Sequence, residues 1–142
     1  MAKEVVANEA VVDALRAALQ KNGYSTLPKR PFGAQGADIV AEKGNEKIVA
    51  EVIGYKVAGP SRRSDFAVAF WAAIGRVDQY PNAKVAIALP SQFMQGFGAR
   101  LDSRRGAWKR LGAAFPELEI WFVNVALQDY ERHPWTQLAD QL

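Results

Sequence analysis

Residues 37–54 read ADIVAEKGNEKIVAEVIG, and this stretch predicts a β-hairpin at the centre of the fold. Two strand-like runs, Ala37–Lys43 and Glu46–Ile53, flank Gly44-Asn45, a dipeptide typical of a two-residue hairpin turn. Pairing the strands outward from that turn gives two opposite-charge pairs and then apolar pairs, which is the pattern that stabilises neighbouring strands.

The same register sets Asp38 opposite Glu51. Cross-strand partners have Cβ atoms about 4.5–5.5 Å apart, and like charges at that separation are destabilising, the more so among apolar neighbours. A divalent cation, Mg²⁺ or Mn²⁺, would relieve the repulsion and could activate water against a phosphodiester. Protonation of one acid, or an ion pair between Glu51 and a distant lysine or arginine, would relieve it too. A slip of one residue would put the two acids on opposite faces.

The segments around the hairpin predict an α/β fold, a mixed central sheet of hairpin and crossover strands flanked by helices, in a single domain over residues 1–142. Helical spacing predicts helices at about Asn8–Asn22 and Asp65–Tyr80 and a broken helical region at Ser91–Ala114; strands are expected at Lys84–Leu89 and Leu118–Val125. The segment Lys56–Ser64 is expected to be a loop, and the tail from Gln128 is unassigned. Apolar periodicity places Phe70, Trp71, Trp108, Trp121 and Phe122 in the core.

The composition excludes several kinds of site. The chain has no cysteine and one histidine, which rules out disulfides, thiolate metal sites and a histidine-rich zinc site. No apolar run approaches the roughly 20 residues needed to span a bilayer, and the first ten residues do not resemble a signal peptide, so we expect a cytoplasmic protein without a membrane partner. A net charge of +3 permits a polyanionic partner.

Basic residues occur in two places that could contact a phosphate backbone. One cluster, within eleven residues, is Arg100, Arg104, Arg105, Lys109 and Arg110. The other is Arg62 and Arg63, in the expected loop after the hairpin. Together they could form a sequence-independent DNA surface, and the alternative is an ordinary solvated face.

The hairpin sequence resembles two related patterns. Gly36-Ala37-Asp38 followed by residues 48–55, IVAEVIGY, resembles the PD-(D/E)XK nucleases. A closer similarity, to the XisH family of excision-controlling proteins, is carried by the following residues: 41–48 (AEKGNEKI), Glu51, Gly59-Pro60-Ser61, and Phe66 with Ala69. The resemblance implies a restriction-endonuclease-like core and a cytosolic protein acting on DNA, or descended from proteins that do. It also implies a metal site formed by Asp38, Glu51 and the backbone carbonyl of Val52, with Glu9 of the first helix and Gln79 of the second as accessory candidates.

One position departs from the nuclease pattern. The lysine two residues after the glutamate is Ile53 here, and isoleucine can neither carry charge nor take a proton. Lys56 is the nearest replacement as a third catalytic residue, provided that the chain turns at Gly54. Two functions therefore stay open: a metal-dependent endonuclease or mobile-element excision factor, and a catalytically inactive protein-interaction module. A homodimer is expected for a nuclease because cutting two strands favours two sites, and nothing in the sequence favours a small-molecule site.

Overall fold

The computed structural model describes residues 5–29 and 36–142, and its strands form a six-stranded sheet. The strands are β1 (Ser25–Thr26), β2 (Ile39–Lys43), β3 (Glu46–Val52), β4 (Lys84–Pro90), β5 (Leu118–Asn124) and β6 (Asp129–Pro134). They lie side by side in chain order; β3, β4 and β5 are parallel and the outer pairs are antiparallel. The predicted mixed sheet is thus confirmed.

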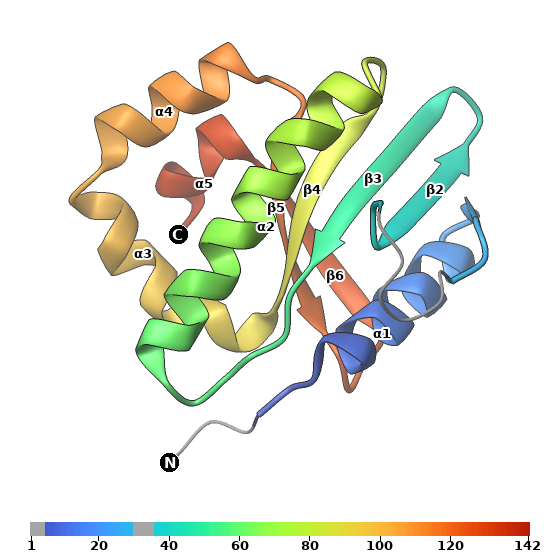
Figure 1. Ribbon diagram of the computed structural model, residues 1–142, viewed down its shortest axis with the longest axis horizontal. Helices are drawn as coiled ribbons and strands as arrows, with labels where there is room; N and C mark the ends of the chain where they lie inside the picture. Colours follow the sequence, from blue (N-terminus) through green and yellow to red (C-terminus); the bar gives the residue numbers. More distant parts are fainter. Residues whose placement is uncertain (1–4, 30–35) are drawn as a thin grey trace.

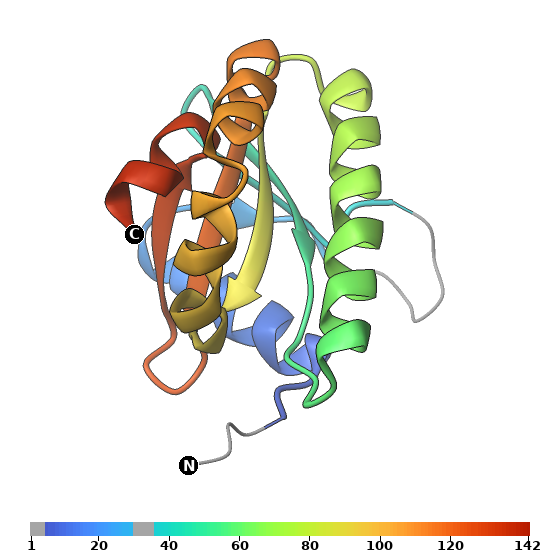
Figure 2. The same ribbon diagram turned by 90° about the vertical axis from the view of Figure 1, so that its left-hand side faces the viewer.

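Helices cover both faces of this sheet. They are α1 (Asn8–Lys21), α2 (Gly59–Gln79), the 3-10 turn η1 (Ser91–Phe93), α3 (Met94–Asp102), α4 (Arg105–Ala114) and α5 (Trp135–Gln141). Figure 1 shows α1 on one side of the sheet and α2 to α5 gathered on the other, and Figure 2 gives the view at right angles. Each face has its own apolar core, one around α1 and one beneath α2 to α5. Of the described helices, none is both long and apolar enough to cross a bilayer.

The hairpin has the predicted register, from Lys43 opposite Glu46 to Ile39 opposite Ala50. Gly44 supplies the positive φ of 58° that the two-residue turn requires. The paired residues end there: Asp38 lies just before β2, and its amide donates a hydrogen bond to the carbonyl of Ala50 at 3.1 Å. The carboxylates of Asp38 and Glu51 still lie close enough to interact, because the side chain of Asp38 reaches over the end of β3.

Two predictions about α2 are wrong. The helix begins at Gly59, with Pro60 in its first turn, so that Arg62 and Arg63 are helical instead of lying in a loop. Proline fits the first turn of a helix, where its missing N–H has no partner to lose. Trp71 is 80% exposed and not in the core. Successive helical positions point about 100° apart, so Trp71 cannot share the inward face that holds its neighbour Phe70.

The unassigned tail completes the sheet and its second helical layer. Strand β6 pairs antiparallel with β5. The short helix α5 then packs on the same face of the sheet as α2, α3 and α4. Trp135, at the start of α5, is buried and stacks on Trp108 of α4 with ring centroids 3.9 Å apart. Each indole N–H donates to the other tryptophan's backbone carbonyl, so the pair locks α5 onto α4.

Candidate functional site

Asp38 and Glu51 form the centre of the predicted site. Asp38 precedes β2, and its Oδ2 accepts a hydrogen bond from the amide of Val52 at 2.8 Å. Glu51 lies within β3 and is only 7% exposed. The pKa of Glu51 is raised to about 7: burial is the main cause, Arg76 opposes the rise, and the negative charge of Asp38 and a side-chain hydrogen bond with it add to the rise. Two carboxylates can share a hydrogen bond only when one carries a proton, and this pKa lets Glu51 hold that proton near neutrality.

Arg76 of α2 supplies a positive charge to this pair. Its Nε lies 2.7 Å from Oε1 of Glu51, and its Nη1 donates to Oε1 of Gln79 at 2.8 Å. Residues three apart on a helix share a face, which is why Arg76 and Gln79 act together. The structure supports two of the ways of relieving the carboxylate repulsion that the sequence leaves open: an ion pair of Glu51 with a distant arginine, and a raised pKa that lets Glu51 take up a proton.

These residues meet the needs of a divalent cation only in part. Oε1 of Glu51 and Oδ2 of Asp38 each already accept a hydrogen bond. Within residues 5–29 and 36–142, no group of three or more histidine, aspartate or glutamate side chains is placed to hold a metal ion. Val52 engages Asp38 through its amide, and its side chain packs in the α1 core.

Ile53 and Lys56 lie in different surroundings. Ile53 is 6% exposed and packs in the apolar core beneath α2 to α5, and its amide donates to the carbonyl of Ala88. Lys56 is ion-paired with Asp65, with 3.0 Å between Nζ and Oδ2. That contact ties Lys56 to the beginning of α2, whereas Arg76 meets Glu51 near the other end of this helix.

The two accessory candidates, Gln79 and Glu9, lie in different surroundings. Gln79 joins the carboxylate pair through Arg76. Glu9 of α1 is engaged elsewhere, in an ion pair with Lys29 at 2.8 Å. The structure thus brings Glu51 and Gln79 to Arg76 and Asp38 to Glu51, and places Glu9 and Lys56 in other ion pairs.

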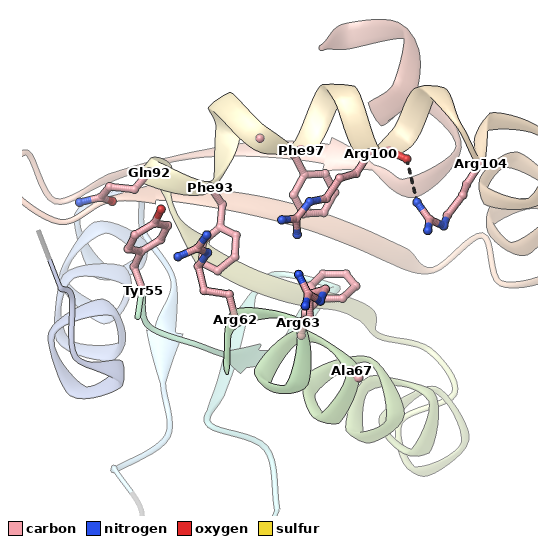
Figure 3. Close-up of a pocket in the computed structure, with 11 residues that line it drawn as sticks. Tyr55, Arg62, Arg63, Ala67, Gln92, Phe93, Phe97, Arg100 and Arg104 are labelled. Atoms are coloured by element: carbon pink, nitrogen blue, oxygen red, sulfur yellow. Dashed lines mark hydrogen bonds between the residues drawn. The ribbon is translucent and has the colours of Figure 1, made fainter. Parts of the chain in front are cut away.

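The basic residues divide into two groups. The arginines at positions 62, 63, 100 and 104 line one pocket of about 470 Å³ between α2 and the η1–α3 segment, as Figure 3 shows. We call this the arginine pocket. Arg105 and Lys109 instead pair with Asp140 of α5, at 2.8 and 3.1 Å, and Arg105 also meets Asp102. Their charges are largely compensated, so they contribute less to a phosphate-binding surface than the sequence cluster suggests.

Sequence reasoning missed the aromatic wall of the arginine pocket. Tyr55, Phe93 and Phe97 line it beside the arginines. A signal was present, because Phe93, Phe97 and Arg100 follow one another at intervals of four and three residues and so share one helical face. The contribution of Tyr55 could not be read this way, since it comes from the chain just after β3.

Two solved structures resemble this fold. One is an XisH family protein from Nostoc punctiforme PCC 73102, with 19% sequence identity, a TM-score of 0.60, and coverage of 87% of this chain and 98% of that one. The other is an FdxN element excision controlling factor protein from Anabaena variabilis, with 18% identity, a TM-score of 0.61, and coverage of 89% and 98%. No protein-family model and no curated protein matches the sequence. At this identity the likeness establishes a shared fold.

Proposed function

We propose that this protein binds DNA without cutting it, as a mobile-element excision factor built on a nuclease-derived, restriction-endonuclease-like core. The ion pair between Arg76 and Glu51 carries the proposal. It places the guanidinium of Arg76 on the carboxylate that a PD-(D/E)XK nuclease would use to hold its metal ion.

Two features of the site argue against hydrolysis. A divalent cation would have to compete with a charge-assisted hydrogen bond of 2.7 Å, which is among the stronger polar interactions in proteins. The position of the nuclease lysine is the buried side chain of Ile53, and Lys56 is paired with Asp65. A phosphodiester placed at Asp38 and Glu51 would therefore meet neither a readily bound metal nor a free lysine.

The support for DNA comes from charge and from fold. In the part of the chain that the structure describes, none of the four arginines of the arginine pocket is in an ion pair with an acid, so their charge is available to phosphates. The two structural neighbours are described as an XisH family protein and an excision controlling factor, which extends this reading to mobile-element excision.

A protein-interaction module is the second candidate. Val68 and Trp71 are 70% and 80% exposed and lie three residues apart on the outer face of α2. A large exposed tryptophan beside an exposed valine is the kind of surface that binds another protein, including a second copy of this chain. For such a module the four arginines of the pocket would have no role in binding DNA.

The experiment combines cleavage with binding. The wild-type protein and Glu51→Gln are incubated with supercoiled plasmid and Mg²⁺ or Mn²⁺, and DNA binding is measured at 50 and 200 mM salt. We expect no cleavage by either protein and binding that weakens steeply with salt, because phosphate contacts release counterions. Cleavage that disappears in Glu51→Gln would overturn the proposal in favour of a metal-dependent nuclease, with Lys56 the first residue to test. Absence of both activities would favour the interaction module.

A further inference from the structure

The arginine pocket is separate from the carboxylate pair. Arg62 and Arg63 lie in the first turns of α2, and Arg76 is near the other end of the same helix. A rise of 1.5 Å per residue puts about 20 Å of helix between Arg62 and Arg76. The pocket is therefore a second site, with its own chemistry.

The positive charge of the pocket is held in place by neutral partners. The guanidinium of Arg62 donates to the carbonyl oxygens of Lys56 and Val57, at 2.7 and 2.5 Å, and lies 4.8 Å from the centre of the Tyr55 ring. Arg104 donates to Oγ of Ser103 and to the carbonyl of Arg100. Carbonyl, hydroxyl and ring partners orient a guanidinium and leave its charge uncompensated, which suits an anion such as phosphate.

The wall of the pocket is aromatic and rigid. Phe93 packs edge-on against Tyr55, with ring centroids 5.2 Å apart. Phe97 makes edge contacts with Phe66, Trp108 and Phe122, each with ring centroids under 6 Å apart. Neighbours on several sides hold these rings; Phe93 is only 9% exposed, so the partly buried Phe97 offers most of the preformed apolar surface.

Figure 3 shows that the arginines and the aromatic rings line the same space. Arg62 and Arg63 extend from α2, and Arg100 from α3, toward the space between the two helices, where Phe93 and Phe97 also lie. Proteins bind unpaired nucleic acid with this combination, in which cations hold the backbone and aromatic rings stack on a base; a stacked base strengthens binding roughly ten- to a hundredfold. The pocket volume of about 470 Å³ falls in the range that encloses a ligand the size of one nucleotide.

We propose that the arginine pocket binds one unpaired nucleotide of a DNA strand, with its phosphate among the arginines and its base against the aromatic wall, chiefly Phe97. This inference rests on the proposed DNA-binding function and names the form of DNA. A duplex keeps its bases stacked inside and offers only its phosphates, so it would leave the aromatic wall without a partner. A single strand, or a strand end, can place both parts of a nucleotide in the pocket.

The first measurement uses small probes and calorimetry. We expect deoxyadenosine 5′-monophosphate to bind at least tenfold more tightly than either deoxyadenosine or inorganic phosphate, because only the nucleotide engages the arginines and the wall together. The double variant Arg63→Gln/Arg100→Gln should weaken nucleotide binding at least tenfold. Both side chains are exposed, so the variant is expected to fold. The matched control is Arg110→Gln on the surface of α4, which should bind as the wild type does. Equal nucleotide binding by the double variant and the control would overturn the proposal.

The second measurement compares DNA forms with the same variants. A 5′-phosphorylated single-stranded oligonucleotide should bind at least tenfold more tightly than a closed dumbbell duplex without ends. Tight binding of the dumbbell alone, with no binding of the nucleotide, would overturn the pocket proposal and leave the DNA-binding function intact. Binding of the free nucleotide with no binding of any DNA would overturn both the strand assignment and the proposed function.

Discussion

Arg76 donates from Nε to Oε1 of Glu51 across 2.7 Å, and this contact ties the last turns of α2 to the end of β3. The Glu51 side chain is 9% exposed and that of Arg76 is 19% exposed, so water can replace little of this contact. Breaking a buried pair by removing one partner costs about 3–5 kcal/mol, because the other charge is left uncompensated. The Arg76–Glu51 pair therefore bears on both the proposed function and the stability of the fold.

Arg76→Gln should destabilise the protein in a pH-dependent way. At pH 8 the variant must either keep Glu51 ionised beside Asp38 without a cation or protonate it, since the loss of Arg76 raises the pKa of Glu51 further, and we expect the free energy of unfolding to fall by up to about 3 kcal/mol. At pH 5 Glu51 is protonated, since its pKa is about 7, and the loss should be smaller. Urea denaturation at both pH values measures the difference. Arg110→Gln, an exposed substitution, should change stability by less than about 0.5 kcal/mol. An equal loss at both pH values would mean that Arg76 acts through packing and not through charge.

The raised pKa of Glu51 predicts a specific dependence of stability on pH. Between its ordinary value of 4.5 and about 7, the folded state binds a proton that the unfolded state does not. The free energy of unfolding should therefore fall as pH rises through this window, by up to about 3 kcal/mol. Glu51→Gln cannot titrate there, so the difference between the two stability curves isolates Glu51 from the other acids. Parallel curves for the two proteins would show that Glu51 titrates normally.

Ile53→Lys should lower stability without creating cleavage. The side chain would put an ammonium group into the apolar core around Tyr55, and we expect a loss of about 3–5 kcal/mol. Ile53→Met keeps the volume and polarity and should cost less than about 1.5 kcal/mol. Thermal unfolding and plasmid nicking are measured for both variants. Cleavage gained by the lysine variant alone would identify position 53 as the one missing element of a nuclease site.

Trp71 should dominate the solvent-accessible tryptophan fluorescence. Of the four tryptophans in the chain, Trp71 is 80% exposed, while Trp121 and Trp135 are buried. Trp71→Phe should remove most acrylamide quenching and change stability by less than about 0.5 kcal/mol. Trp135→Phe is the contrasting variant, because it removes the indole hydrogen bond to Trp108. Quenching that decreases as the wild-type protein is concentrated would instead show that the outer face of α2 is covered in a dimer.

Gly112→Ala should destabilise α4, although alanine is the better helix former. A Cβ at this position would lie 2.6 Å from the Thr136 side chain and 3.0 Å from the Trp135 ring, so α5 would have to move. We expect a loss of about 1–3 kcal/mol. Gly106 of the same helix has nothing within 4 Å of the added carbon, and Gly106→Ala should stabilise by up to about 1 kcal/mol. Chemical denaturation of the two variants tests this; opposite signs are expected, and a stabilised Gly112→Ala would refute tight docking of α5.

Short-range sequence signals were enough to predict the hairpin. Features that depend on contacts between distant residues could not be predicted. The turn at Gly44 and the adjacent charge pairs are encoded within a few residues, so the register from Lys43 inward could be derived. Which residue pairs with Glu51 could not be derived, because Arg76 is 25 residues away on a helix whose rotation depends on packing. Strand β6 escaped prediction for a similar reason, since its polar sequence forms a strand by pairing with the buried β5.

The order of the strands has a consequence for how the chain is made. Because β1 to β6 lie in the sheet in the order in which they leave the ribosome, no later strand has to open a gap between two earlier ones. Each strand can therefore join the edge formed by the strand before it without separating an earlier pair. The stacking of Trp135 on Trp108 joins α5 to α4, so the second core is complete only when residues 135–141 are in place.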